Sequence, residues 1–220
     1  MLDHIPLFPL NTILFPGMPL ELQIFEKRYT VMMKQVLSSE PVFGVVLIRR
    51  GVESLGPLAE PYMIGTLARI IEVEQLEGGK MNITIVGENR FQINEIFKDE
   101  PFLTGNISEF PLEYKRPLDV LRRIRPLRNH VHYYLQTIDK LNENPMDLNL
   151  IEMPEDPISF LFLAASLLQI PSHEKFPILS SQTALGVCMA VERLYRRENA
   201  VMRSLIQTSD EEARNIALLN

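Results

Sequence analysis

The stretch "NTILFPGMPLELQIFEKRY", residues 11–29, joins a tight turn, a strand and the start of a helix. Pro16-Gly17 is a turn signal. In "LELQIF" (residues 20–25), leucine and isoleucine alternate with polar residues, which predicts a half-buried strand. Apolar residues then recur at helical spacing from Tyr29 to Leu37. We therefore expect the chain to turn, form a strand, and fold a helix that begins near Glu26 back over a sheet.

The sequence around this stretch, up to about residue 115, has the pattern of a β-rich region. "KMNITIV" (80–86) alternates in the same way, and "ARIIEVEQ" (68–75) and "RFQINEIF" (90–97) flank it, which predicts a meander. Gly78-Gly79 predicts one hairpin turn, because glycine adopts positive φ without steric cost, and Gly87 to Asn89 predicts the next. "PVFGVVLIRR" (41–50) is more continuously apolar, which predicts a central strand.

Beyond about residue 115 the apolar spacing becomes helical. Residues 117–141 predict a helix that is kinked or broken at Pro126, since proline has no amide proton to donate. Asp156-Pro157 supplies an N-cap and a first helical residue for a second helix. A long final helix is expected from near Ser181, with one buried stripe that consists of Ala184, Cys188, Val191, Tyr195, Met202 and Leu205.

These patterns predict an α+β fold in which strands and helices are segregated along the chain. We expect a β-rich domain at residues 1–115, a helical subdomain at residues 116–206 and a C-terminal tail at residues 207–220, which either continues the last helix or frays from it.

The composition is that of a globular protein with an acidic excess. The chain has 220 residues, of which 46% are hydrophobic, and a net charge of −6 at pH 7. The single cysteine, Cys188, excludes an internal disulfide and is typical of a reducing compartment. The N-terminus has no basic region followed by an unbroken apolar stretch, so we expect no signal peptide. We predict a cytoplasmic protein without membrane contact.

The motifs of common catalytic sites are missing from the sequence. The only Gly-Lys pair, Gly79-Lys80, is followed by methionine and not by the Ser or Thr of a phosphate-binding loop. His130 and His132 are two residues apart, which points them to different sides of a helix. Cys188 lies on an apolar stripe, where a thiol packs rather than reacts. We therefore predict no catalytic residues, no metal and no cofactor.

Two regions are candidate binding surfaces. Phe15, Met18 and Phe25 surround the turn and strand of residues 11–29, and large apolar side chains beside loop prolines are able to hold apolar segments of other proteins. For each of these three residues taken singly, a position in the hydrophobic core is the alternative interpretation.

The second candidate surface is a basic helix. Residues 115–134 contain six lysines or arginines and one aspartate, a net charge of +5, so the rest of the chain carries −11. Such a helix is able to follow a phosphate backbone. A solvated face that pairs with the acidic remainder is the favoured interpretation, and we expect no nucleic acid partner. The residues concerned are Arg122, Arg123, Arg125 and Arg128.

Three segments resemble the N-terminal domain of Lon protease, particularly its free-standing bacterial versions. "IPLFPLNTILFPGMPLELQIFEKRYTVMM" (5–33) is similar to the opening signature of that family, and "IGTLARIIEVEQLEGGKMNITIVGENRFQI" (64–93) is similar to its second block. "DPISFLFLAASLLQIPSHEKFPILSSQTALGVCMAVERLYRRE" (156–198) is similar to its helical half. The resemblance covers residues from about 5 to 206.

The resemblance implies a PUA-like β pseudobarrel with one inserted helix, followed by a helical subdomain, and a role in recognising protein substrates. The ATPase and Ser-Lys peptidase modules of the protease have no counterpart in the sequence, so we expect no protease activity. Lys27 departs from the family, whose free-standing members often have proline there. The positions that match family motifs are interpreted as mainly structural; they are Phe15, Pro16, Gly17, Glu26, Arg28, Tyr29, Gly87, Arg90 and Phe91.

We therefore expect a non-catalytic module that binds apolar or unfolded segments of client proteins, with a protease or chaperone as a further partner. Two alternatives stay open. One is RNA binding through the basic helix, which rests on fold-level analogy. The other is an accessory subunit of a separate ATP-dependent protease. The sequence does not settle the oligomeric state.

Overall fold

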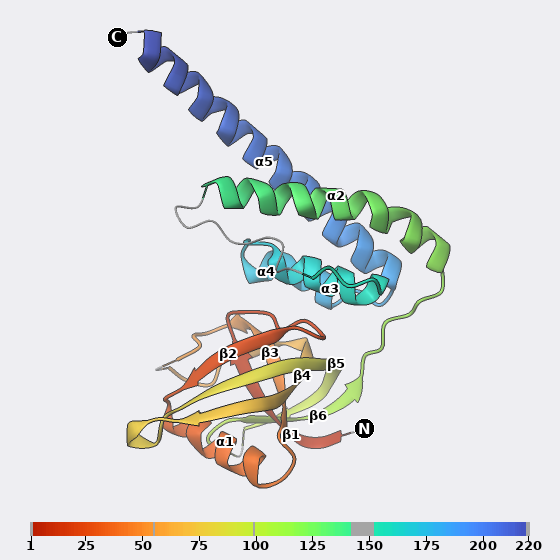
Figure 1. Cartoon of the computed structure of the whole chain (residues 1–220). Helices are drawn as coiled ribbons and strands as arrows, with labels where there is room; N and C mark the ends of the chain where they lie inside the picture. The colour runs from red at the N-terminus through yellow and green to blue at the C-terminus, as the bar shows by residue number, and fades with distance from the viewer. Residues whose placement is uncertain (1, 55, 99, 142–151, 219–220) are drawn as a thin grey trace.

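The computed structural model describes residues 2–54, 56–98, 100–141 and 152–218, and it has a strand-rich part followed by a helical part (Figure 1). The α+β class is confirmed. The strands are β1 (Leu2–Leu10), β2 (Pro19–Ile24), β3 (Val42–Arg50), β4 (Glu60–Gln75), β5 (Met81–Phe97) and β6 (Leu103–Glu109). The helices are α1 (Lys27–Ser38), the short 3-10 helix η1 (Glu77–Gly79), α2 (Pro117–Leu141), α3 (Pro157–Leu167), α4 (Ser172–Leu179) and α5 (Ala184–Leu218).

The strands close into the expected pseudobarrel. Their order is β2-β5-β4-β3-β1-β6, and β6 also pairs with β5. β1 and β3 are parallel, and the other pairs are antiparallel. The first half of β5 pairs with β2, from Met81 to Val86, and its second half pairs with β6, from Phe91 to Phe97. One long strand therefore closes the barrel and also carries β2 as an extra strand.

Phe91 and Leu7 belong to a buried cluster of the barrel together with Val46, Ile93, Leu103 and Ile107, and glycines make room for them. A Cβ atom on Gly44 of β3 would lie 2.7 Å from Phe91 Cζ and 2.8 Å from Leu7 Cδ2. A Cβ atom on Gly65 of β4 would lie 2.7 Å from the same Phe91 carbon. Two neighbouring strands thus carry glycine where one aromatic ring fills the space between them.

The inserted helix α1 covers one side of the barrel (Figure 1). It follows an extended N-cap residue, Glu26, as predicted. Its buried side chains are Tyr29, Met32, Met33 and Val36. The Tyr29 ring meets Phe8 of β1 edge to face, with centroids 4.3 Å apart. Leu37, at the end of the predicted stripe, is exposed.

The helical part has its own core. α2 and α5 run in the same direction. Arg123 of α2 pairs with Glu192 of α5, and seven residues further along both helices the His130 carbonyl accepts a hydrogen bond from Asn199. The predicted buried stripe of α5 is confirmed for Ala184, Cys188, Val191 and Tyr195. Met202 is only half-buried, and the side chain of Leu205 lies outside the described part. Residues 207–218 of the expected tail continue α5, which is one of the two alternatives for this segment, and residues 219–220 lie outside the described part.

One local prediction is wrong: β5 continues through Gly87 to Asn89, where a turn was expected, and only its register against β4 shifts there. α2, which was predicted to be kinked or broken at Pro126, continues through the proline as one helix, because the buried residues Ile124, Leu127 and Val131 keep it against the core on both sides. Pro126 itself is exposed, so solvent is able to satisfy the carbonyl that its missing N–H leaves unpaired.

Within the described ranges, no helix combines the length and the apolar character that crossing a bilayer requires.

Candidate functional site

The segment that precedes β2 is locked onto the barrel by backbone contacts. Gly17 has a φ of 77°, as a glycine turn requires, and its amide donates to the Gly87 carbonyl at 2.8 Å. The Gly87 amide donates back to Met18 at 3.0 Å. Thr66, which is buried in β4, donates from its hydroxyl to the Leu14 carbonyl at 2.7 Å. These hydrogen bonds therefore fix the turn at Pro16-Gly17 to the barrel.

The three predicted client-binding residues lie in two places. Phe15 is buried and stacks on Phe162 of α3, with ring centroids 6.0 Å apart. Met18 packs against the same helical core, and its sulfur accepts a hydrogen bond from Ser166 at 3.4 Å. Phe25, at the end of β2, is 48% exposed. Phe15 and Met18 therefore connect the barrel to the helices, and Phe25 is the exposed member of the set.

Phe25 stands at a cleft of about 210 Å³ between β2, the start of α1 and the loop after β3. Its lining includes the buried apolar side chains of Phe8, Leu10 and Tyr29. Carboxylates line it as well, from Glu21, Glu26 and Glu53. Burial raises the pKa of Tyr29, so its hydroxyl stays protonated and neutral at physiological pH. The cleft is an apolar hollow with an acidic edge.

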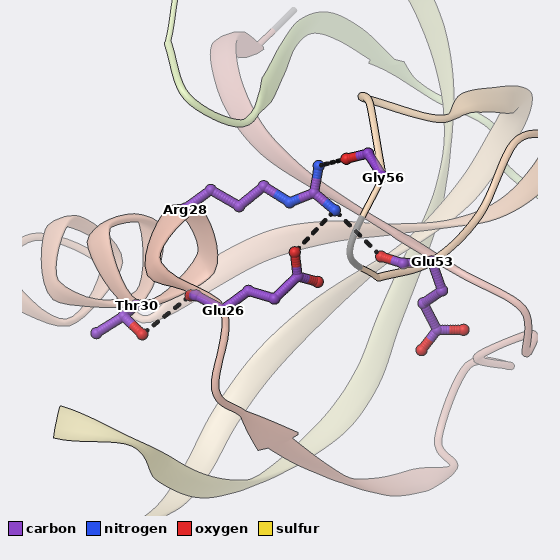
Figure 2. Close-up of polar contacts among 5 residues, drawn as sticks. All are labelled: Glu26, Arg28, Thr30, Glu53 and Gly56. Carbon is purple, nitrogen blue, oxygen red and sulfur yellow. Dashed lines mark hydrogen bonds and ion pairs between the residues drawn. The ribbon is translucent and has the colours of Figure 1, made fainter. Parts of the chain in front are cut away.

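Arg28 holds one wall of this cleft in place (Figure 2). Its Nη1 donates to the Gly56 carbonyl at 3.1 Å and its Nη2 donates to the Glu53 carbonyl at 3.3 Å. The same Nη2 lies 3.1 Å from a carboxylate oxygen of Glu26, and the guanidinium lies 4.8 Å from the centroid of the Tyr29 ring. One arginine on α1 thereby fixes the loop that carries Glu53.

Figure 2 also shows the start of α1, where the Thr30 hydroxyl donates to the Glu26 carbonyl at 3.0 Å. The Glu53 side chain points away from Arg28 and accepts a hydrogen bond from the Asn11 amide at 2.7 Å. Sequence reasoning did not identify Glu53 or its loop, although Gly51 and the Gly56-Pro57 pair mark a loop there.

Arg90 precedes Phe91 on β5, and its side chain reaches the helical part of the molecule. Arg90 is 5% exposed, and its Nη1 donates to the carbonyls of Leu179 and Ser181, each at 2.6 Å. Its guanidinium lies 4.8 Å from the centroid of Phe110. Burial lowers the pKa of Arg90 to about 10, so the side chain is still charged at neutral pH. Arg90 therefore ties the barrel to the connection between α4 and α5.

The basic residues of α2 have different environments. Arg123 pairs with Glu192 at 2.8 Å. Arg128 donates to the Pro154 carbonyl and lies 4.1 Å from the centroid of Phe160, so it is part of the packing between helices. Arg122 and Arg125 are exposed.

Cys188 is buried, and burial raises the pKa of its thiol to about 11, so the reactive thiolate is scarcely populated at neutral pH. Among the described residues, no group of three or more His, Cys, Asp or Glu side chains is placed to hold a metal ion.

Comparisons with known proteins agree with this architecture. The family model described as the ATP-dependent protease La (LON) substrate-binding domain matches residues 4–185. Lon protease from Anaeromyxobacter dehalogenans is 24% identical over 201 residues, which are 90% of this chain and 24% of that protease. Lon protease from Parabacteroides distasonis is 29% identical over 150 residues, 66% of this chain and 18% of the protease. The chain thus spans a quarter or less of the length of these curated relatives.

Two solved structures share the fold. The Lon N-terminal domain protein from Xanthomonas campestris aligns with a TM-score of 0.58 and 23% identity, covering 88% of this chain and 97% of that one. The N-terminal domain of a Mycobacterium avium complex Lon protease aligns with a TM-score of 0.60 and 15% identity, covering 88% and 98%. With a family model that matches most of its length, the chain belongs to the LON substrate-binding domain family.

Proposed function

We propose that this chain is a non-catalytic module that binds apolar segments of client proteins, and that the cleft beside Phe25 is the binding site. The observation that carries the proposal is the position of Phe25, a large aromatic side chain that is 48% exposed at an apolar hollow. Aromatic side chains on a surface contribute more to protein binding than most other residues. The family relationship supports a role in substrate recognition.

The size of the cleft suggests how a client is held. A volume of about 210 Å³ is smaller than the several hundred Å³ typical of a site for a whole small molecule. One apolar side chain of a client would enter it and contact Phe8, Leu10 and Tyr29. Phe25 would cover the inserted group from the side.

The charges around the cleft suggest which clients are preferred. Glu21, Glu26 and Glu53 line it, and no lysine or arginine is among its described lining residues. Opposite charges across an interface favour one class of partner over another. We therefore expect apolar segments flanked by lysine or arginine to bind better than the same segments flanked by glutamate.

Peptide binding to the purified chain tests this proposal. Fluorescence polarisation would compare one apolar peptide with lysine flanks and the same peptide with glutamate flanks. Phe25→Ser is expected to weaken binding of the lysine-flanked peptide about thirtyfold, which corresponds to the roughly 2 kcal/mol lost at an interface hot spot. Leu118→Ser is the matched control, since Leu118 is 67% exposed on α2, far along the chain from the cleft. If both variants weaken peptide binding equally, or if the peptide with lysine flanks binds no better, the cleft is not the client-binding site.

A second role, which rests on the first, is delivery of clients to a separate ATP-dependent protease in the cytoplasm. It is favoured because the relatives that the chain matches are Lon proteases several times its length. A labelled client mixed with a purified Lon protease and ATP would be degraded faster when the chain is added. If the chain only slows degradation, it competes for the client and does not deliver it.

A further inference from the structure

A long groove lies between α2 and the first half of α5, on a part of the molecule that the cleft beside Phe25 does not include. Two adjoining hollows of about 550 Å³ each form it, and both are lined by Arg123 and Met189. Between Leu185 and Arg196, α5 borders the groove over about 16 Å, at roughly 1.5 Å of rise per residue, which is three helical turns.

The groove combines apolar surface with positive charge. Met189 is 51% exposed, and Leu185 and Ala190 also line the groove. Methionine on a surface adapts to apolar groups of different shape. The arginines that line it come from both helices and outnumber the carboxylates of Asp119 and Glu192; they are Arg116, Arg122, Arg123, Arg193 and Arg196.

The arginines differ in whether their charge is already neutralised. Glu192, which is only 7% exposed, pairs with Arg123 at 2.8 Å and with Arg196 at 2.6 Å. Arg116 pairs with Asp119 within α2 at 2.7 Å. Arg122 and Arg193 are exposed and form no ion pair with any residue that the structure describes. The groove therefore has two unneutralised guanidinium groups, one from each helix.

We propose that this groove binds an acidic, amphipathic segment of another protein. Its apolar side chains would lie on Met189, and its carboxylates would pair with Arg122 and Arg193. Guanidinium groups bind carboxylates through paired hydrogen bonds, and helices with one apolar face commonly lie in grooves of this length. Residues 115–134, which supply the α2 side of the groove, carry a net charge of +5 while the other residues carry −11, so an acidic partner is attracted to this side of the molecule.

The lining favours a protein segment over a nucleic acid. None of the described groove residues is aromatic, whereas proteins that bind single strands stack bases on aromatic rings. Arg128, which belongs to the same basic segment, is used for packing against Phe160.

The test uses a fluorescein-labelled peptide of about 20 residues, long enough to form a helix, with glutamate on one face and leucine on the other. Fluorescence polarisation would measure its binding to the whole chain and to the double variant Arg122→Glu/Arg193→Glu. We expect the variant to bind at least about tenfold more weakly, since two charge-assisted contacts are lost. Met189→Ser is expected to weaken binding about threefold through lost apolar contact.

The matched control is Arg50→Glu/Arg125→Glu, which makes the same change in total charge at exposed arginines that do not line the groove. Circular dichroism would confirm that all variants are folded. The proposal is overturned if the peptide does not bind, or if both double variants weaken it equally. Tighter binding of a mixed-sequence RNA with the same dependence on Arg122 and Arg193 would assign the groove to nucleic acid instead. Concentration-dependent dimers that only the groove variant abolishes would assign it to a second copy of the chain.

Discussion

Gly87 illustrates how a residue without a side chain determines a contact between distant segments. It lies inside β5 and does not have positive φ, so it does not form the turn that its sequence context predicts. A Cβ atom at this position would overlap the Phe15 carbonyl oxygen and lie 3.2 Å from Leu14 Cγ. Glycine at this position lets the segment before β2 approach the backbone of β5 and pair with it. The sequence motif that suggests a turn therefore marks a close contact between two backbones.

Replacing Gly87 with alanine should therefore destabilise the fold. The added methyl group meets backbone, which cannot rotate away, so we expect a loss of about 2–3 kcal/mol in the free energy of unfolding. Urea unfolding followed by circular dichroism measures it. The control is Gly79→Asn, because Gly79 has a φ of 76° with no atom near its missing Cβ, and asparagine tolerates that conformation. A loss at Gly87 no larger than at Gly79 would show that the segment moves aside without cost.

At the scale of elements, α3 depends on its first residues. The helix is apolar nearly all round, so no polar stripe defines where it begins. Its start is set by Asp156, which accepts hydrogen bonds from the Ser159 amide at 2.7 Å and hydroxyl at 2.8 Å, and by Pro157 in the first turn. These two residues were predicted from the sequence, because capping is chemistry between neighbours in the chain.

The Asp156 cap should make stability depend on pH in a specific way. The bonds from Ser159 lower the pKa of Asp156 below its usual value, so the ionised cap stabilises the fold above the unfolded pKa of about 3.9. That contribution is lost as the pH falls through the lowered folded pKa.

We expect Asp156→Ala to cost about 1 kcal/mol of unfolding free energy at neutral pH and progressively less below about pH 4. Asp156→Asn is the control, since asparagine caps without titrating, so the stability difference between Asp156→Asn and Asp156→Ala should not change with pH, whereas the wild type should lose stability relative to both in acid. Urea unfolding at several pH values measures both variants. A cost of Asp156→Ala that stays constant down to acid pH would exclude the carboxylate as the capping group.

The elements that the sequence did not predict share a physical reason. β1 contains Pro6 and Pro9, which usually argue against a strand, yet it pairs with both β3 and β6. α4 has only eight residues with Pro177 among them, too short for a helical period to be recognised. Alternation predicted β2 and the first half of β5 because one face of each is exposed. β1, in contrast, forms a strand because it pairs with β3 and β6, which are distant in the sequence.

The candidate site was predictable to a similar extent. Of the three residues predicted to bind clients, only Phe25 lines the cleft, whereas Phe15 and Met18 do not. Glu26 and Tyr29, which were interpreted as mainly structural, line it as well. The opposite wall, which carries Glu53, depends on hydrogen bonds from Arg28 to carbonyls 25 and 28 residues away. No local signal contains that information.

At the scale of the whole molecule, a small set of contacts joins the barrel to the helices. Phe15 stacks on Phe162, and Tyr62 of β4 stacks on Phe176 of α4 with centroids 4.0 Å apart. Glu113 exchanges backbone hydrogen bonds with the residues on either side of Thr183. Arg90 is the polar centre of this junction. The division into subdomains near residue 115 stays a prediction, and these contacts provide a way to test it.

Arg90→Met should loosen the helices from the barrel while leaving the barrel intact. The variant removes both hydrogen bonds to the Leu179 and Ser181 carbonyls and leaves these acceptors without their donor, a loss we put at about 3 kcal/mol. Hydrogen exchange read by mass spectrometry would then show faster exchange in α4 and the first turns of α5, with β3 and β4 unchanged. Arg69→Met is the matched control, because Arg69 forms an ion pair with Glu88 on the neighbouring strand at the surface, where such pairs add little to stability. Equal acceleration throughout the chain in Arg90→Met would mean that barrel and helices unfold as one unit, and the predicted boundary near residue 115 would then have no energetic meaning.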